Sequence, residues 1–244
     1  MKNYFLLITI LSILSIQSFA QTLGSGLSDI DGNVYKSVMI DSQEWMASNL
    51  KVKHFQDGSP ITYAQNDNEW LIAAKNQSAA WCYVDTIFKD EVLYNWYAVN
   101  DPRGLAPRDW FIPTSSDFSD LNNHIACIDV YSQSGTHLRD SIGWGQVFIY
   151  TKCDSCLTRE VEIGLSLNGK NTTSFSAKPI NSRIISDDKN SYFFFPSFNT
   201  QAIWWSTTSF LSNKGLTWVL REELVKEIND SGQGFSVRCI KHKS

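Results

Sequence analysis

The sequence lacks several features that would each indicate a common class of function. It has no basic stripe: 21 lysines and arginines stand against 25 acidic residues, with a net charge of −4. A surface built to bind nucleic acid is therefore not expected. No second long apolar run follows the N-terminal one, so we expect no transmembrane segment in the mature chain. The four histidines are scattered and do not have the spacing of a metal site.

The N-terminal stretch 1–20 has the composition of an export signal. Lys2 precedes an apolar run, Phe5–Ile16, and a small-x-small cleavage sequence ends at Ala20. The run is shorter than the ~20 residues that span a bilayer, and no cysteine lies near the cut. We therefore expect an exported protein, secreted or held in the periplasm or cell envelope, that is cleaved after Ala20 and is not a lipoprotein.

The remainder predicts one irregular domain. Residues 21–28 are small and glycine-rich, which is typical of a short flexible lead. No linker, repeat or low-complexity block divides the rest, so we expect a single domain over 29–242. Short strand-like segments, few helical ones and long polar loops favour the α+β class, with short strands and one or two helices.

The acidic stretch DIDGN, at 29–33, is either a calcium loop or a tight turn. An EF-hand loop has acidic residues at positions 1, 3 and 5 and glycine at position 6, whereas here Gly32 follows Asp31 directly. Asp-Gly before alternating apolar residues is instead a strong hairpin signal. We therefore predict a turn without a metal, then a strand over Val34–Ile40. Gln43–Leu50 is either a short helix or an irregular packed segment.

The segment TSSDFSDLNNHI contains the clearest helix signal. Thr114 is a good N-cap with Asp117 three residues on, a variant of the capping box. Phe118, Leu121 and Ile125 follow at intervals of three and four, which places them on one face. Further elements are expected as a helix at Glu69–Lys75 and strands at Gln146–Tyr150, Glu160–Leu167, Tyr192–Phe195, Ala202–Thr207, Leu216–Leu220 and Gly234–Ile240.

Five motifs occur in the order and approximate spacing of one protein family. They are DIDGNVYKSVMIDSQEWMASNLK, LYNWYAVND, DWFIPTSSDFSDL, WWSTTS and GFSVRCIK. In these motifs the chain resembles the Fibrobacter succinogenes major paralogous domain, over nearly the whole mature chain. That family is similar to the C-type lectin-like fold, particularly to the formylglycine-generating enzymes. The resemblance implies paired N- and C-terminal strands, a large loop region and an exported or surface-associated protein.

The sequence argues against catalysis. Formylglycine-generating enzymes carry two reactive cysteines shortly before the terminal Gly-Phe-Arg strand, and here the corresponding VLREELVKEINDSGQ has none. The Gly-x-Ser-x-Gly nucleophile elbow of hydrolases is absent. Glu222 and Glu223 lie on a polar segment that is typical of a solvent-exposed face. The tripeptides of calcium-dependent lectins are also absent. We therefore expect no enzyme activity and no cofactor, with a hydrolase or oxidase of unrecognised site as the alternative.

Cysteines are the candidates for covalent cross-links, because an exported chain can reach an oxidising compartment. Their odd number leaves at least one unpaired. The pair at 153 and 156 is expected to form a loop disulfide or to bond to Cys127, rather than to hold zinc. In the family a cysteine often occupies the position of Ala106, so Cys239 either lacks its usual partner or pairs with Cys82. The candidates are Cys82, Cys127, Cys153, Cys156 and Cys239.

Aromatic residues are abundant, at 13% of the chain with nine tryptophans. Tryptophan rings can stack on sugars, but they also build cores. Strand alternation predicts that one of Trp204 and Trp205 points into the core, which leaves at most the other exposed. We expect a non-catalytic binding or surface-interaction module for a polysaccharide or another envelope protein, or else a purely structural envelope component. The candidate binding residues are Trp81, Trp96, Trp204, Trp205 and Trp218, with Asn95 and Asn100 beside them.

Overall fold

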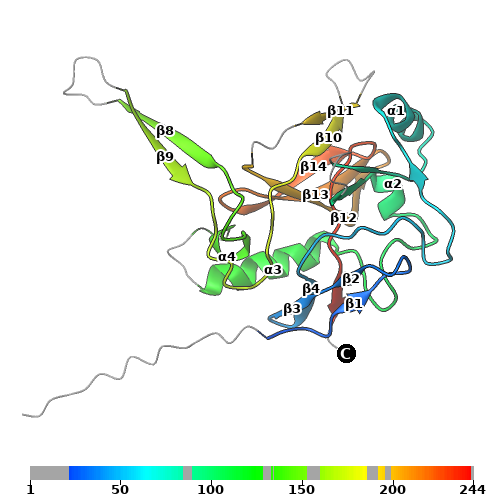
Figure 1. Cartoon of the computed structure of the whole chain (residues 1–244), viewed down its shortest axis with the longest axis horizontal. Coiled ribbons are helices and arrows are strands. Elements are labelled where there is room, and N and C mark those ends of the chain that lie inside the picture. Colours follow the sequence, from blue (N-terminus) through cyan, green and yellow to red (C-terminus); the bar gives the residue numbers. More distant parts are fainter. Residues whose placement is uncertain are drawn as a thin grey trace, which may run out of the picture.

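A computed structural model describes residues 22–84, 90–128, 133, 135–152, 160–185, 192–195 and 199–242. The predicted export signal lies outside these residues. Within them the chain forms six small β-sheets and four helices (Figure 1). This mixture is consistent with the predicted α+β class. The expected one or two helices are too few, because two short connecting segments each form a single helical turn.

The central sheet separates two hydrophobic cores. Its order is β12-β13-β14, antiparallel throughout, with β12 Ala202–Leu211, β13 Lys214–Leu220 and β14 Leu224–Asp230. Successive side chains of a strand point to opposite faces. Trp205 and Val219 accordingly belong to one core cluster, and Trp204 and Trp218 to the other. Both faces of β12 are therefore covered over its first half.

The C-terminal strand pairs with the N-terminal part of the chain. β15, Ile240–His242, lies antiparallel to β4, Gln43–Met46, which also pairs with β3, Ser37–Ile40. The C-terminal strand thus pairs with an N-terminal segment, although with Gln43–Met46 and not with the predicted first strand at Val34–Ile40. The stretch Gln43–Leu50, expected to be helical or irregular, begins instead with β4. This strand forms because Trp45 packs on one core and Met46 on the other.

The remaining elements surround these two sheets. The pair β5–β6 is parallel, and the other pairs among the described strands are antiparallel. The β8–β9 hairpin extends from the body in Figure 1. The bounds are β1 Leu27–Ser28, β2 Val34–Tyr35, β5 Thr62–Tyr63, α1 Asp67–Lys75, β6 Ala80–Tyr83, β7 Val92–Tyr94, α2 Trp96–Val99, α3 Ser115–Ile128, α4 Gly135–Leu138, β8 Gln146–Lys152, β9 Glu160–Ser166, β10 Ser182–Ile185 and β11 Tyr192–Phe195.

Helix α3 confirms the strongest local prediction. The Thr114 hydroxyl and backbone N–H both donate to Asp117 Oδ2 at 2.7 Å, and the Asp117 N–H is 3.3 Å from Thr114 Oγ1. This reciprocal arrangement satisfies donors at the helix start. Phe118, Leu121 and Ile125 are buried in the same core cluster as Trp204.

The predicted flexible lead is hydrogen-bonded in its described part, 22–28. The Met39 N–H donates to the Thr22 carbonyl, and the Gly24 N–H to the Ser37 carbonyl, both at 2.9 Å. Leu27–Ser28 then forms β1 against β2. These contacts place the described part of the lead against β3, and glycine permits the close approach, because a Cβ on Gly24 would lie 2.3 Å from Ser37 Oγ. The flexibility of the lead stays a prediction.

The stretch 29–33 is a turn, as predicted. The Asp29 carboxylate accepts hydrogen bonds from the Asp31 and Asn33 backbone N–H groups, from the Asn33 amide and from the Tyr35 hydroxyl, at 2.6–3.0 Å. Gly32 has a φ of +80°, which glycine adopts without steric cost. The carboxylate therefore closes the turn with protein donors.

Replacing Asp29 by alanine tests this role. We expect Asp29→Ala to lower the free energy of unfolding by about 1–3 kcal/mol, because the donors it satisfies lose their acceptor. The exposed Asp120→Ala is the control, with a change within about 0.5 kcal/mol. Urea unfolding followed by circular dichroism measures both. If a chelator destabilises the wild type but not Asp29→Ala, the stretch is a metal loop after all.

Candidate functional site

The predicted binding tryptophans are mostly buried. Trp204 and Trp205 are both 0% exposed, and Trp81 and Trp218 are 5% exposed, while Trp96 is half-buried. Of Trp204 and Trp205, at most one of which was expected to be exposed, neither faces solvent, because β12 has a core on each side. These rings therefore do not form an exposed row on which a sugar could stack.

The two asparagine candidates differ. Asn95 is fully buried and caps α2: its Oδ1 accepts from the Ala98 and Ala80 N–H groups at 3.0 Å, and its Nδ2 donates to the Ser78 carbonyl at 2.8 Å. Asn95 therefore uses its amide group to hold the fold together, and this group is not available to a ligand. Asn100 is exposed at the C-terminal end of α2. The described contacts do not join it to Trp204 or Trp205 in a shared site.

One predicted tryptophan does border a partly exposed aromatic group. Tyr63 stacks on Trp81 with ring centroids 4.4 Å apart, and Tyr83 meets Trp81 edge-on at 5.0 Å. Lys53 Nζ lies 5.4 Å from the Trp81 ring centroid and donates to the Tyr83 hydroxyl at 2.8 Å. We call Lys53, Tyr63, Trp81 and Tyr83 the aromatic cluster. Its rings mainly cover one another, which leaves little free ring face.

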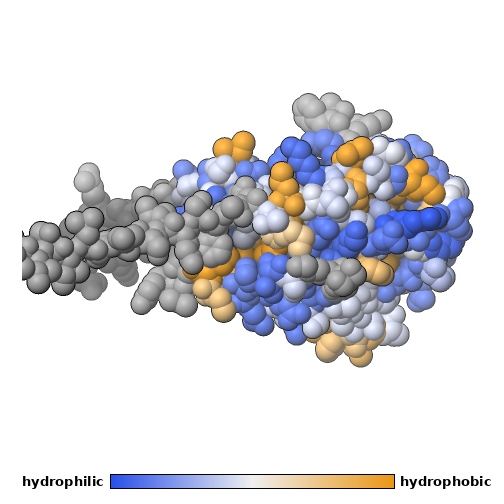
Figure 2. All heavy atoms as spheres, turned by 90° about the horizontal axis from the view of Figure 1, so that it is seen from below, coloured by the Kyte–Doolittle hydropathy of each residue, from blue (hydrophilic) through white to orange (hydrophobic). Residues whose placement is uncertain are grey.

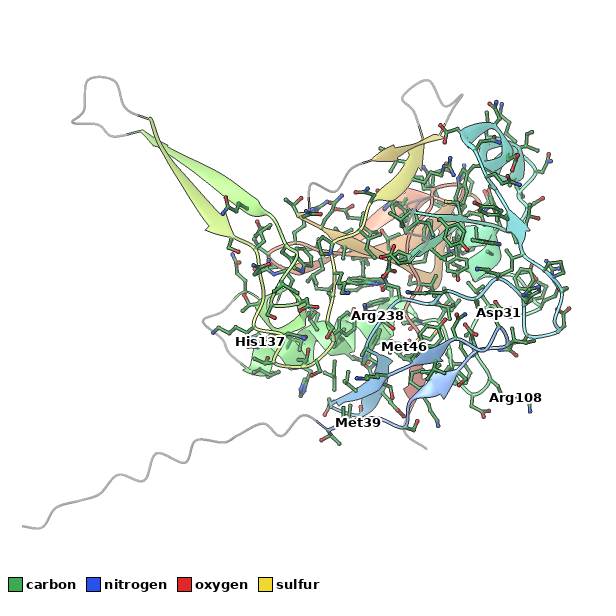
Figure 3. The ribbon with its side chains drawn as sticks, in the orientation of Figure 1. Asp31, Met39, Met46, Arg108, His137 and Arg238 are labelled. Atoms are coloured by element: carbon green, nitrogen blue, oxygen red, sulfur yellow. The ribbon has the colours of Figure 1, made fainter. Side chains whose placement is uncertain are left out.

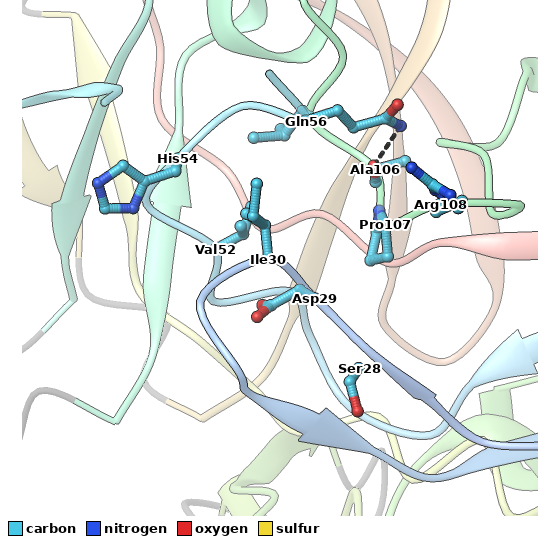
Figure 4. Close-up of a pocket in the computed structure, with 10 residues that line it drawn as sticks. Ser28, Asp29, Ile30, Val52, His54, Gln56, Ala106, Pro107 and Arg108 are labelled. Atoms are coloured by element: carbon cyan, nitrogen blue, oxygen red, sulfur yellow. Dashed lines mark hydrogen bonds between the residues drawn. The ribbon is translucent and has the colours of Figure 1, made fainter. Parts of the chain in front are cut away.

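A first pocket, of about 280 Å³, lies beside the Asp29 turn (Figure 4). Two of its polar side chains are already engaged: Gln56 Nε2 donates to the Ala106 carbonyl at 2.6 Å, and His54 Nδ1 lies 2.5 Å from Asp31 Oδ1. In Figure 4 the Asp29 carboxylate lies between the His54 and Arg108 sides. This pocket therefore offers few convergent polar groups to a ligand.

A second pocket, of about 330 Å³, is polar. Its charged and amide side chains come from loop segments that are far apart in the sequence. A further cavity of about 240 Å³ shares two of these residues, Glu91 and Lys178, so the two adjoin. We call this site the Arg238 pocket, and its ionisable and amide lining residues are Asn49, Lys51, Glu91, Asp140, Lys178 and Arg238.

Arg238 is the most unusual group of this pocket, because it is a cation at 1% exposure. Its Nε and Nη2 donate to Asn49 Oδ1 at 3.2 and 3.0 Å, and Nη1 donates to the Phe175 carbonyl. The guanidinium also lies over the Phe175 ring, 4.2 Å from its centroid. Figure 3 shows Arg238 inside the molecule, between the central sheet and β4. Burial lowers the pKa of Arg238 to about 9.

Glu91 lies on the other side of Asn49. The Asn49 amide donates to Glu91 Oε2 at 3.2 Å. Burial raises the pKa of Glu91, against the opposing effects of Lys51, Asn49 and Arg238. One amide thus holds a buried cation through its oxygen and a half-buried acid through its nitrogen. The same Asn49 oxygen also accepts from Trp204 Nε1 at 2.9 Å, which ties the pocket to the core.

Sequence reasoning missed this pocket. Asn49 and Arg238 are 189 residues apart, and both lie inside family motifs that were used only for the fold. The one available signal was Arg238 as the single charged residue in the run from Phe235 to Ile240, since a charged side chain that is buried needs a polar partner.

The cysteine candidates are not cross-linked where the structure describes them. Cys82, Cys127 and Cys239 are free, so the pairing of Cys82 with Cys239 is not formed. The two belong to different core clusters, whereas Ala106 lies in the same cluster as Cys239. Burial raises the pKa of Cys82 to about 11, which suppresses its thiolate. Cys153 and Cys156 lie outside the described residues.

The described surface does not present one broad apolar face in the view of Figure 2, where hydrophobic residues lie in small groups between hydrophilic ones. Over the described ranges, no helix has both the length and the hydropathy needed to cross a membrane. Nor do three or more histidine, cysteine, aspartate or glutamate side chains gather there as a metal site would require.

Comparison with known proteins identifies a family. The model of the Fibrobacter succinogenes major domain matches residues 38–241. No curated protein and no solved structure matches the chain significantly. The match begins within β3 and ends within β15, so it covers both cores and the Arg238 pocket.

Proposed function

We propose that this chain, which belongs to the Fibrobacter succinogenes major domain family, is an exported, non-catalytic binding module that holds a glycan in the Arg238 pocket. The observation that carries the proposal is the convergence of six amide and charged side chains on one cavity of about 330 Å³. Ligand sites are commonly cavities of about 300–1,000 Å³ with a few convergent polar groups. We also propose a C-type lectin-like architecture, which the pairing of β15 with β4 supports.

The lining chemistry suits sugar hydroxyl groups. Glu91 and Asp140 supply acceptors, Lys51 and Lys178 supply donors, and hydroxyl groups can engage both kinds at once. Among the described residues, neither lysine ammonium has a protein partner within ion-pair distance. These groups are therefore available to a ligand, unlike the engaged polar groups of the first pocket.

A glycan array tests the proposed function directly. We expect the mature protein to bind a subset of glycans, with the same binding after chelation of calcium, and Lys178→Met to weaken binding several-fold. Lys226→Met, on the exposed side of β14, is the matched control and should bind like the wild type. Absence of binding to every glycan would refute the proposal, and loss on chelation would refute its metal-free form.

One observation favours a second function, glycoside hydrolysis. Glu91 and Asp140 line the same pocket, and a carboxyl group with a raised pKa is what a general acid requires. A reducing-end assay on the glycans that bind distinguishes the two. Binding without new reducing ends supports the binding module. Turnover that Glu91→Gln abolishes, with binding retained, assigns the protein as a hydrolase.

Glu91 also predicts a pH dependence of stability. Because burial raises the pKa of Glu91 above its ordinary value of 4.5, the native state holds this proton more tightly than the unfolded state does. The stabilisation is complete below about pH 4.5 and is lost as pH rises through the raised pKa. One proton changes the slope by at most about 1.4 kcal/mol per pH unit. Urea unfolding of wild type and Glu91→Gln across this range should show a shallower decline for the variant; parallel curves would contradict the prediction.

A further inference from the structure

We propose that the ligand of the Arg238 pocket carries a carboxylate, as sugars of the uronic-acid class do, and that Arg238 recognises this group together with Lys51 and Lys178. This inference rests on the proposed function, because it names the chemical class of the glycan. It goes beyond that function, since a binding module of the same fold could equally take a neutral sugar.

The first argument is the unbalanced charge of Arg238. A guanidinium has five N–H groups, and the protein acceptors of Arg238 are Asn49 Oδ1 and the Phe175 carbonyl, both uncharged. In the described part of the chain no carboxylate lies within ion-pair distance of it. A buried cation without an anion is strongly unfavourable. A carboxylate in the cavity would supply the missing charge. It would also accept hydrogen bonds from Nη1 and Nη2, which is the bidentate geometry that arginine prefers.

The second argument is the sign of the pocket. Three cations, Lys51, Lys178 and Arg238, line it against two acids, Glu91 and Asp140. Ligand hydroxyls alone would not neutralise this excess, whereas one carboxylate would.

The shape of the site favours a glycan over an acidic peptide. Peptides are commonly bound by adding a strand to a sheet edge or by laying a helix in an apolar groove. The Arg238 pocket is instead lined by polar side chains from loops, next to β4 and β7, in a cavity of about 330 Å³. Such a site suits a compact ring with several hydroxyl groups.

Isothermal titration calorimetry with matched probes tests the inference. The probes are a galacturonic-acid oligomer, the neutral galactose oligomer of equal length and an oligoglutamate peptide, each titrated at low and at physiological salt. We expect the uronate to bind roughly tenfold or more tightly than the neutral oligomer, as a charge-assisted bidentate pair implies. This advantage should be smaller at higher salt, because salt screens the attraction between the ligand carboxylate and the exposed Lys178.

Variants assign the preference to the pocket. Arg238→Met should remove the uronate preference, and Lys51→Met and Lys178→Met should each reduce it several-fold, while Lys226→Met leaves it unchanged. Circular dichroism shows whether Arg238→Met is folded, and the lysine variants decide the matter if it is not. Equal binding of uronate and neutral oligomers overturns the inference but keeps the proposed function. Binding of neither oligomer overturns the inference, and the proposed function falls with it if no glycan on the array binds. Tighter binding of oligoglutamate replaces the glycan by an acidic peptide.

Discussion

Trp205→Ala is expected to lower the free energy of unfolding by about 3–5 kcal/mol, the usual cost of truncating a fully buried tryptophan. Trp205 is enclosed where the central sheet meets the first core. Its ring meets Phe235 edge-on at 4.9 Å between centroids, and its Nε1 donates to the Tyr94 carbonyl at 2.8 Å. Truncation leaves a cavity and removes one of the two hydrogen bonds to the Tyr94 carbonyl, which keeps the one from the Phe235 N–H. Since domains are stable by about 5–15 kcal/mol, the loss is a large fraction of the total.

Urea unfolding followed by far-ultraviolet circular dichroism measures this loss without depending on tryptophan fluorescence. Phe210→Ala is the matched control, because Phe210 lies on the same strand and is 54% exposed; we expect less than about 1 kcal/mol there. The comparison separates a core role from a sugar-stacking role. If Trp205→Ala is as stable as Phe210→Ala but no longer binds glycan, Trp205 contacts the ligand and not the core.

Asn49→Leu is expected to cost about 3–5 kcal/mol, because one side-chain oxygen serves three buried donors. Asn49 Oδ1 accepts from Trp204 Nε1 and from two nitrogens of Arg238. Leucine has a similar volume, so the loss reflects the missing acceptor more than a cavity. The buried guanidinium, deprived of its amide partner, contributes most of the cost.

A double-mutant cycle isolates that contribution. When Arg238→Met is added to Asn49→Leu, the stranded charge disappears, and we expect a substantial part of the lost stability to return. Chemical unfolding of the wild type, both single variants and the double variant gives the interaction free energy. Additive losses in the two single variants would show that Asn49 does not hold Arg238 in place.

Local signals in the sequence predicted local structure well. The helix at Ser115–Ile128 follows from Thr114, Asp117 and the spacing of its apolar residues, all of which act within a few residues of one another. The Asp29 turn is local in the same sense. The family motifs led to the expectation that the first and last strands pair, and β15 does pair with an N-terminal strand, although with β4 instead of the predicted first strand.

Features that depend on tertiary surroundings were not predictable in this way. Burial of both Trp204 and Trp205 requires knowing that each face of β12 meets a core. The strand β14 was missed because Glu222, Glu223 and the residues after them look like a solvated face. This edge strand is instead formed by pairing with β13 along its whole length, Lys214↔Asp230 to Leu220↔Leu224. The Arg238 pocket was missed because folding alone brings Asn49, Glu91 and Arg238 together.

Hydrogen-exchange mass spectrometry of the full protein, with and without a saturating amount of the tightest-binding oligosaccharide, is the most direct test of where the ligand lies. The Arg238 pocket predicts slowed exchange in the segments that contain Asn49–Lys51, Glu91, Ser176–Lys178 and Arg238. Protection confined to the aromatic cluster, around Tyr63 and Trp81, would contradict it and place the glycan on the tryptophan side of the molecule.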